Sequence, residues 1–194
     1  MPLGAARFGL SGSGVQDLVL IQSQTPSAVA NIDFTSIDES KYNIHFVTYT
    51  LKPATDNATL GCRFIEGGTV ESSSVYKEGH FEILSQGNNE DSNAQIHYRS
   101  TSRDHIRVGE NTGNSTGEGG SGYFYIYNAG DSNIFTSLTC HNAGLNNSNN
   151  LLKAHGGGTM NQKSTVDGFR IFDKNNGGNL TGKISLYGVT FFFF

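Results

Sequence analysis

The sequence has few charged residues, few prolines and no tryptophan. Charged residues make up 15% of the 194 residues, and the formal net charge is -4. A protein that holds a phosphate backbone needs a surplus of lysine and arginine, so nucleic acid is not an expected partner. Only 3 prolines accompany 25 glycines, and aromatic residues reach 11%. This composition is typical of many short strands joined by tight turns.

The sequence also has no long apolar run and only two cysteines. No stretch of about 18 apolar residues occurs, so we expect no transmembrane helix and no membrane insertion. The opening residues lack a basic segment followed by an apolar core, so we expect no secretory signal. Two cysteines are too few for a disulfide framework. Cys62 is in phase with Leu60 and Phe64, and Cys140 with Leu138, so both are expected to be free thiols in the core.

Apolar and polar residues alternate along most of the chain, as in Ala30, Ile32 and Phe34 with Asn31 and Asp33 between them. Alternation with a period of two is typical of a half-buried strand, and no stretch has a helical period. We therefore predict an all-β protein of about ten strands, arranged as an antiparallel two-sheet β-sandwich with a jelly-roll-like form. The β-sandwich domain is expected at residues 18–194. Residues 1–17, which are small and Gly-rich, are expected to form an extended N-terminal docking arm.

The last strand is the clearest one. Leu180, Ile184 and Leu186 fall on one parity and Lys183 on the other, which indicates one buried and one wet face. The Asn175 to Gly178 segment favours a tight hairpin between the last two strands, because asparagine and glycine tolerate positive φ. Further strands are predicted at 18–24, 30–34, 41–51, 60–64, 75–84, 94–98, 106–109, 121–128, 133–139, 151–154 and 166–173.

Motifs for catalysis or for cofactors are weak. The glycine-dense segment 113–122 lacks the Lys-Ser/Thr of a phosphate loop, and 173–184 lacks the final carboxylate of a calcium loop. The six histidines are scattered without metal-ligand spacing. A glycosidase would need two carboxylates in one cleft, whereas the nearby Glu66, Glu71, Glu78 and Glu82 are expected on a solvated sheet face. We therefore predict no enzyme activity, no metal and no cofactor.

Two aromatic segments indicate contacts with another molecule. Tyr123, Tyr125 and Tyr127 share one parity, while Phe124 and Ile126 share the other. If the even residues are core, the tyrosines lie against a subunit, against another layer of the chain or against a sugar ring. Four phenylalanines end the chain, and each would forgo roughly 1.5 to 3 kcal/mol if left exposed. We assign both segments to an oligomer interface, with completion of the last core strand as the alternative for the phenylalanines: Tyr123, Tyr125, Tyr127, Phe191, Phe192, Phe193 and Phe194.

Several segments together resemble a known group of proteins. They are MPLGAARFGL, IQSQTPSAVANIDFTSI, KYNIHFVTYTLKP, GNSTGEGGSGYFYIYN and VDGFRIFDKNNGGNLTGKISLYGV. In these segments the chain resembles small virion surface proteins of tailed phages that infect marine bacteria, of tail-fibre or head-decoration type. The likeness covers most of the chain and is one of sequence style. The run Phe191–Phe194 departs from the usual ending.

The resemblance implies a non-enzymatic structural protein that is made in the host bacterial cytoplasm and displayed on the virion surface. Its expected partners are itself, as a homo-oligomer and by the resemblance a trimer, and other virion proteins of the tail or capsid. A tail-associated fibre or adhesin is the first expectation, and a capsid decoration protein is the alternative. A lectin-like domain that binds a host surface glycan is a further one. The resemblance assigns virion docking to residues of the arm, namely Leu3, Gly4, Ala5, Arg7, Phe8 and Leu10.

Overall fold

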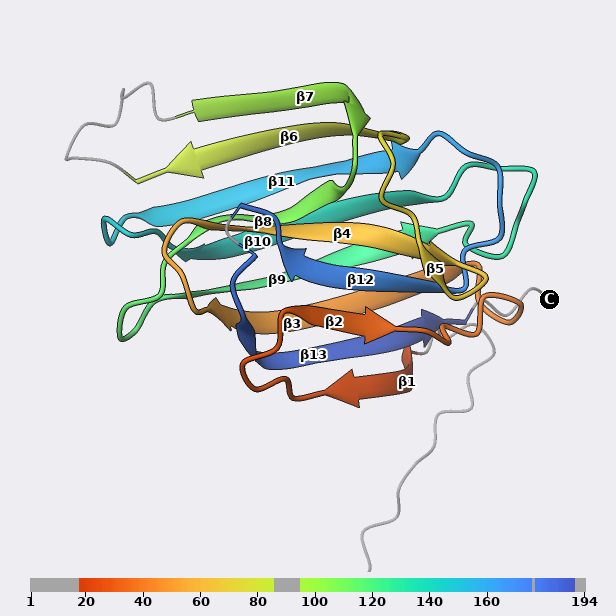
Figure 1. The fold of residues 1–194 in the computed structure, drawn as a ribbon, viewed down its shortest axis with the longest axis horizontal. Helices are drawn as coiled ribbons and strands as arrows, with labels where there is room; N and C mark the ends of the chain where they lie inside the picture. Colours follow the sequence, from red (N-terminus) through yellow and green to blue (C-terminus); the bar gives the residue numbers. More distant parts are fainter. Residues whose placement is uncertain (1–17, 86–94, 176, 191–194) are drawn as a thin grey trace, which may run out of the picture.

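A computed structural model describes residues 18–85, 95–175 and 177–190. Within these residues the chain forms thirteen strands and no helix, in two sheets that pack face to face (Figure 1). The predicted antiparallel β-sandwich is confirmed. The described residues include no helix long and apolar enough to cross a membrane.

The larger sheet has eight antiparallel strands. In spatial order they are β1 (Leu18–Gln24), β13 (Leu180–Val189), β3 (Ile44–Pro53), β9 (Gly119–Tyr127), β10 (Ser137–Leu145), β11 (Leu151–Met160), β6 (Tyr76–Leu84) and β7 (Gln95–Arg103). Strands β1 and β7 are therefore its two edges.

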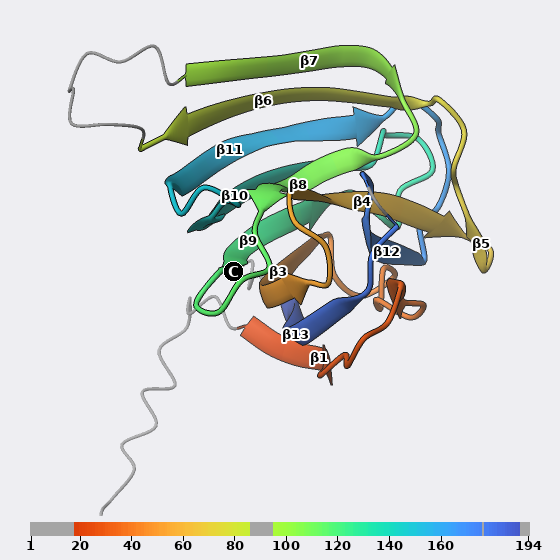
Figure 2. The same ribbon diagram turned by 60° about the vertical axis from the view of Figure 1, so that its left-hand side comes forward.

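The smaller sheet has five strands. It contains β2 (Asn31–Phe34), β12 (Gly168–Asp173), β4 (Ala58–Glu66) and β5 (Thr69–Val70), with β8 (Ile106–Thr112) also paired to β4. In Figure 2 the strands β7, β6 and β11 of the larger sheet arch over β8. Strand β8 contacts β6, β9, β10 and β11, so it lies under the larger sheet as well as beside β4.

Parity along each strand decides which side chains meet between the sheets. In β9, Phe124 and Ile126 are fully buried, and in β13 the same holds for Leu180, Ile184 and Leu186. Phe169 of the smaller sheet stacks on Phe34 with 4.8 Å between ring centroids and meets Phe124 edge to face at 5.6 Å. These rings join the two sheets into one core.

Both cysteines are buried free thiols, as predicted. Burial raises the pKa of Cys140 to about 12 and raises that of Cys62 further, so both behave as small apolar side chains.

The predicted hairpin between the last two strands is wrong. β12 pairs with β2 and β4 in the smaller sheet, whereas β13 pairs with β1 and β3 in the larger one. The connection between them therefore crosses from one sheet to the other. Asp173 stabilises this crossing: its carboxylate accepts hydrogen bonds from Thr55 Oγ1 at 3.0 Å and from the backbone N–H of Gly178 at 3.2 Å.

Candidate functional site

The candidate site is the outer face of the larger sheet. Tyr123, Tyr125 and Tyr127 lie on this face, and Tyr123 is 39% exposed. The smaller sheet packs on the other side, against Phe124 and Ile126. In the part of the chain that the structure describes, no further strand layer covers the tyrosines. Burial of these tyrosines by a second subunit stays a prediction.

Rings from seven neighbouring strands form a continuous line across this face, which we call the aromatic row. The register of the strands places these residues side by side, because each is paired with its neighbour or lies two residues away from that pairing. From β13 to β7 the aromatic row consists of Tyr187, Phe46, Tyr125, Tyr123, His141, His155, Phe81 and His97.

The rings of the row contact one another at stacking distances. Tyr123 and His141 have centroids 5.2 Å apart and planes 16° apart, and His141 and His155 are 5.8 Å and 20° apart. Phe81 lies 5.1 Å from His155 and 4.9 Å from His97. Such pairs contribute roughly 0.5 to 1.5 kcal/mol each beyond their buried area. The central rings therefore face each other across the strands and turn their edges to solvent.

Three of the six histidines lie in this row, although their positions in the sequence do not indicate that they come together. His97, His141 and His155 are exposed and come from β7, β10 and β11. Each has outward parity in its strand, but only the strand register brings the three together. Cys140 and His141 point to opposite faces, as predicted. Among the described residues, no group of three or more His, Cys, Asp or Glu side chains could hold a metal ion.

Two hollows open beside the aromatic row. The first has a volume of about 450 Å³ and is lined by Tyr123, His141 and Lys153, among others. The second has about 660 Å³ and is lined by Phe81, His97, Arg99 and His155, with Gly79 and Gly156 also in its wall. Sites for small ligands commonly measure 300 to 1,000 Å³.

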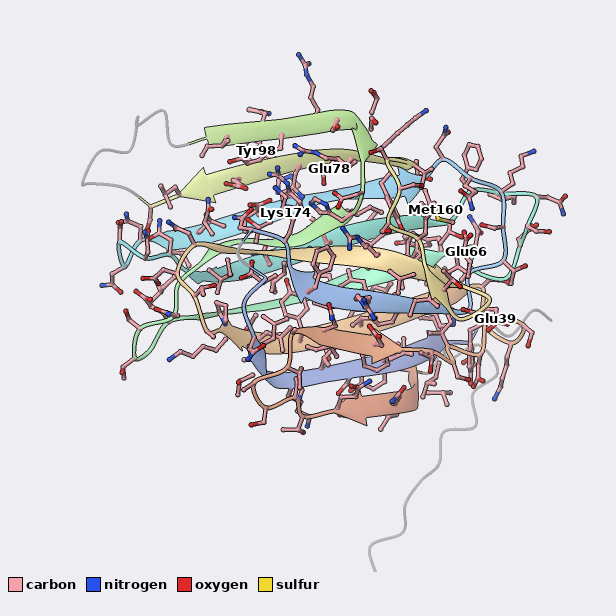
Figure 3. The ribbon with its side chains drawn as sticks, viewed as in Figure 1. Glu39, Glu66, Glu78, Tyr98, Met160 and Lys174 are labelled. Atoms are coloured by element: carbon pink, nitrogen blue, oxygen red, sulfur yellow. The ribbon has the colours of Figure 1, made fainter. Side chains whose placement is uncertain are left out.

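A second group of polar residues lies inside the sandwich, between β6, β7 and β8 (Figure 3). Glu78 forms ion pairs with Arg103 at 3.2 Å and with Arg107 at 3.3 Å. Arg107 also donates a hydrogen bond to Glu110 at 3.0 Å, and Thr59 donates one to the same carboxylate at 3.1 Å. We call Glu78, His80, Glu82, Tyr98, Arg107 and Glu110 the buried polar cluster.

The expected solvated face of glutamates is therefore wrong. Glu78 and Glu82 share the parity of the buried Tyr76 and point inward, and Glu82 has 0% exposure. Glu66 and Glu71 are half-buried and accept hydrogen bonds, the first from Gln162 and the second from Ser73. The inward parity of Glu78 and Glu82 is visible in the sequence, but carboxylates on a strand are normally assigned to solvent.

Burial changes the protonation of the cluster. It raises the pKa of Glu82 to about 8, and the neighbouring Glu110 raises it as well. Burial also raises the pKa of Glu110, against the opposing effect of Arg107. For His80, burial and then the charge of Arg107 lower the pKa to about 4. Glu82 and His80 are therefore mainly neutral at pH 7. The Glu82 side chain is fully buried, so its carboxyl group is not accessible from solvent.

Several predicted site residues lie outside the described part of the chain. They are the docking residues Leu3, Gly4, Ala5, Arg7, Phe8 and Leu10 and the terminal Phe191, Phe192, Phe193 and Phe194.

Fold and site together define a two-sheet β-sandwich with an open face of aromatic and histidine side chains. No family model, curated protein or solved structure matches the chain.

Proposed function

We propose that the protein is a non-catalytic binding module on the surface of a phage particle, of the tail-fibre or adhesin type. The observation that carries the binding role is the aromatic row, which runs over seven strands and includes the exposed Tyr123 and three exposed histidines. Monomeric proteins rarely leave large contiguous apolar or aromatic patches without a partner. Aromatic rings with polar edges are enriched where proteins bind other molecules.

The assignment to a virion rests on the sequence resemblance. In this proposal residues 1–17 attach the protein to the particle, and the sandwich presents its open face outward. A variant that lacks residues 2–14 should fold and remain in the supernatant when particles are purified. Full-length protein should co-purify with them, and retention of the shortened variant on particles would overturn the role of the arm.

Copy number tests the tail-fibre assignment. Quantitative mass spectrometry of purified particles should find the chain in a few copies per particle. A copy number that matches the number of positions in the capsid lattice would instead support head decoration. Absence of the chain from the particles would overturn the virion assignment itself.

Head decoration is a second candidate, and the edge strand β1 favours it. Leu18 and Leu20 are 54% and 56% exposed on this strand, and Val19 between them is exposed as well. An exposed apolar edge is a template for pairing with another chain. In this candidate a second copy also covers Tyr123, Tyr125 and Tyr127. Light scattering should then give an oligomer that the double substitution Leu18→Lys and Leu20→Lys disperses, whereas a wild-type monomer at high concentration would count against it.

A further inference from the structure

Charge is strongly segregated on the larger sheet. Its eight strands contain only two carboxylates, Glu78 and Glu82, and both point into the sandwich. The charged side chains that these strands place on the outer face are all cations, and all are exposed: Lys52, Lys77, Arg99, Lys153 and Lys183.

The outer face of the larger sheet therefore has the opposite charge to the protein as a whole, whose net charge is -4. The smaller sheet differs, because its Arg170 is paired with Asp33 and its Arg63 with Asp104. None of the described salt bridges involves Arg99 or Lys153. Unpaired cations on an otherwise acidic protein favour an anionic ligand at this face.

Gly79 keeps the second hollow open. It lies opposite Arg99 on β7 and opposite Gly157 on β11. A Cβ atom at Gly157 would lie 2.2 Å from the carbonyl oxygen of Leu138, so close packing requires glycine there. A Cβ atom at Gly79 would meet nothing within 4 Å, and its φ is not positive.

Among the described glycines, Gly79 alone combines free space with an ordinary strand conformation. A glycine inside a strand weakens the strand, and it often marks a position that a ligand approaches closely. Neither backbone strain nor packing explains the glycine at position 79, whereas access to the hollow does.

The two hollows repeat one chemical composition. The first combines the aromatic Tyr123, the imidazole of His141 and the cation Lys153. The second combines Phe81, the imidazole of His155 and the cation Arg99, with His97 in addition. His141 and His155 stack on each other, so the two hollows adjoin through this pair. A ligand that repeats its own chemistry along its length matches such an arrangement.

We propose that this face binds an acidic polysaccharide, with one negatively charged sugar residue in each hollow. Arg99 and Lys153 pair with the carboxylate or sulfate groups of successive acidic sugars. The ring nitrogens of the histidines form hydrogen bonds with sugar hydroxyls, and the ring edges of Phe81 and Tyr123 contact the apolar faces of the sugar rings. The inference deepens the proposed function, on which it rests, by naming the class of ligand.

Two other occupants fit the face less well. A single-stranded nucleic acid would stack its bases on aromatic faces, but the rings of Tyr123, His141 and His155 already face each other. A second copy bound through the same face would bring Arg99 and Lys153 against like charges, which costs affinity. A ligand that uses ring edges and supplies negative charge avoids both problems.

Isothermal titration calorimetry of the full chain tests the proposal with four probes: an alginate hexamer for carboxylate, dextran sulfate for sulfate, neutral dextran as the uncharged match, and oligo-dT. We expect binding to alginate or to dextran sulfate, and the stronger of the two identifies the anionic group. Neutral dextran should not bind. Equal binding of dextran would overturn the charge argument, and tighter binding of oligo-dT would assign the face to nucleic acid.

Three variants locate the site. Arg99→Gln should weaken binding by about tenfold or more, because a charge-assisted contact is lost. Gly79→Val should weaken it at least as much by filling the hollow. Its melting temperature should equal or exceed that of the wild type, because valine favours a strand. Lys183→Gln removes one cation from the same face on β13 and should change binding less than about twofold.

The variants also separate this inference from the proposed function. If Lys183→Gln weakens binding as much as Arg99→Gln does, the attraction is diffuse and the hollow is not the site. If no probe binds while the chain co-purifies with particles, the inference fails and the virion role stands. If the chain binds an acidic glycan through Gly79 and Arg99 but is absent from particles, the inference holds and the virion role fails.

Discussion

Arg107 lies over the ring of Tyr98, with 4.1 Å between the guanidinium carbon and the ring centroid. The same guanidinium group pairs with Glu78 at 3.3 Å and with Glu110 at 3.0 Å. One cation from β8 thus pairs with two buried carboxylates and covers an aromatic ring of the edge strand β7. The buried polar cluster consequently fastens the edge of the larger sheet to the strand beneath it.

Removal of Arg107 should be strongly destabilising. Arg107→Met leaves Glu78 without one of its two cations and Glu110 without its only described ion-pair partner, in a buried site. Loss of one partner from a buried ion pair typically costs about 3 to 5 kcal/mol. Urea unfolding should show a decrease of this size, whereas Arg99→Met on the exposed face should change stability by less than about 0.5 kcal/mol. Equal losses of unfolding free energy in the two variants would mean that the ion pairs of Arg107 do not stabilise the fold.

The contribution of Glu82 to stability should fall as the pH rises from 5 to 9. Its pKa is about 8 in the folded protein against an ordinary value of 4.5, so the folded state binds this proton more tightly than the unfolded state. The contribution is full below pH 4.5 and is lost as the pH rises through 8. Glu82→Gln keeps the neutral form at every pH and should be more stable than the wild type at pH 9 by roughly 2 to 4 kcal/mol.

Urea unfolding at pH 5, 7 and 9 measures this effect. Glu39→Gln serves as the matched control, since Glu39 is remote in sequence from the cluster and only half-buried. It should retain the wild-type pH dependence. An unchanged alkaline slope in Glu82→Gln would show that Glu82 is not the group that titrates.

Adjacent residues of β9 should respond very differently to truncation. Phe124 is fully buried between the sheets, and Tyr123 next to it is 39% exposed on the outer face. Phe124→Ala should cost about 3 to 5 kcal/mol by leaving a cavity. Tyr123→Ala loses ring contacts only and should cost less than about 1.5 kcal/mol. Chemical denaturation compares the two, and a larger loss in Tyr123→Ala would mean that the outer face is covered.

The terminal phenylalanines, which lie outside the described residues, give a prediction about assembly. Replacement of Phe191 to Phe194 by serine should weaken a homo-oligomer, because apolar contact area is lost. Light scattering of both proteins measures the mass, and thermal unfolding measures the stability. Unchanged values in both measurements would assign no role to this segment.

The sequence predicts the fold class well because a strand records its buried face in its own residues. Leu180, Ile184 and Leu186 have the predicted parity, as do Phe124 and Ile126. Pairing is decided between distant segments, and no local pattern encodes it. The Asn175 to Gly178 segment favours a tight turn, yet β12 and β13 find their partners in different sheets.

The same limit applies to the site. The three tyrosines of β9 alternate with Phe124 and Ile126, so the sequence alone predicts that they share one face. His97, His141 and His155 come together only when the register of β7, β6, β11 and β10 is known. The buried polar cluster also depends on the position of β8, which places Arg107 and Glu110 against β6. No short sequence motif encodes the aromatic row or the buried polar cluster.

The pairing of β1 with β13 places Leu18 directly beside Val189. Leu18 and Val189, at the two ends of the described domain, therefore lie at the same edge of the larger sheet. The hollow at Gly79 lies near the other edge, where β6 pairs with β7. Seven strand spacings of about 4.8 Å separate β1 from β7, roughly 34 Å along the sheet. If the proposed arm attaches the domain beside β1, the hollow at Gly79 therefore stays accessible at the far edge of the sheet.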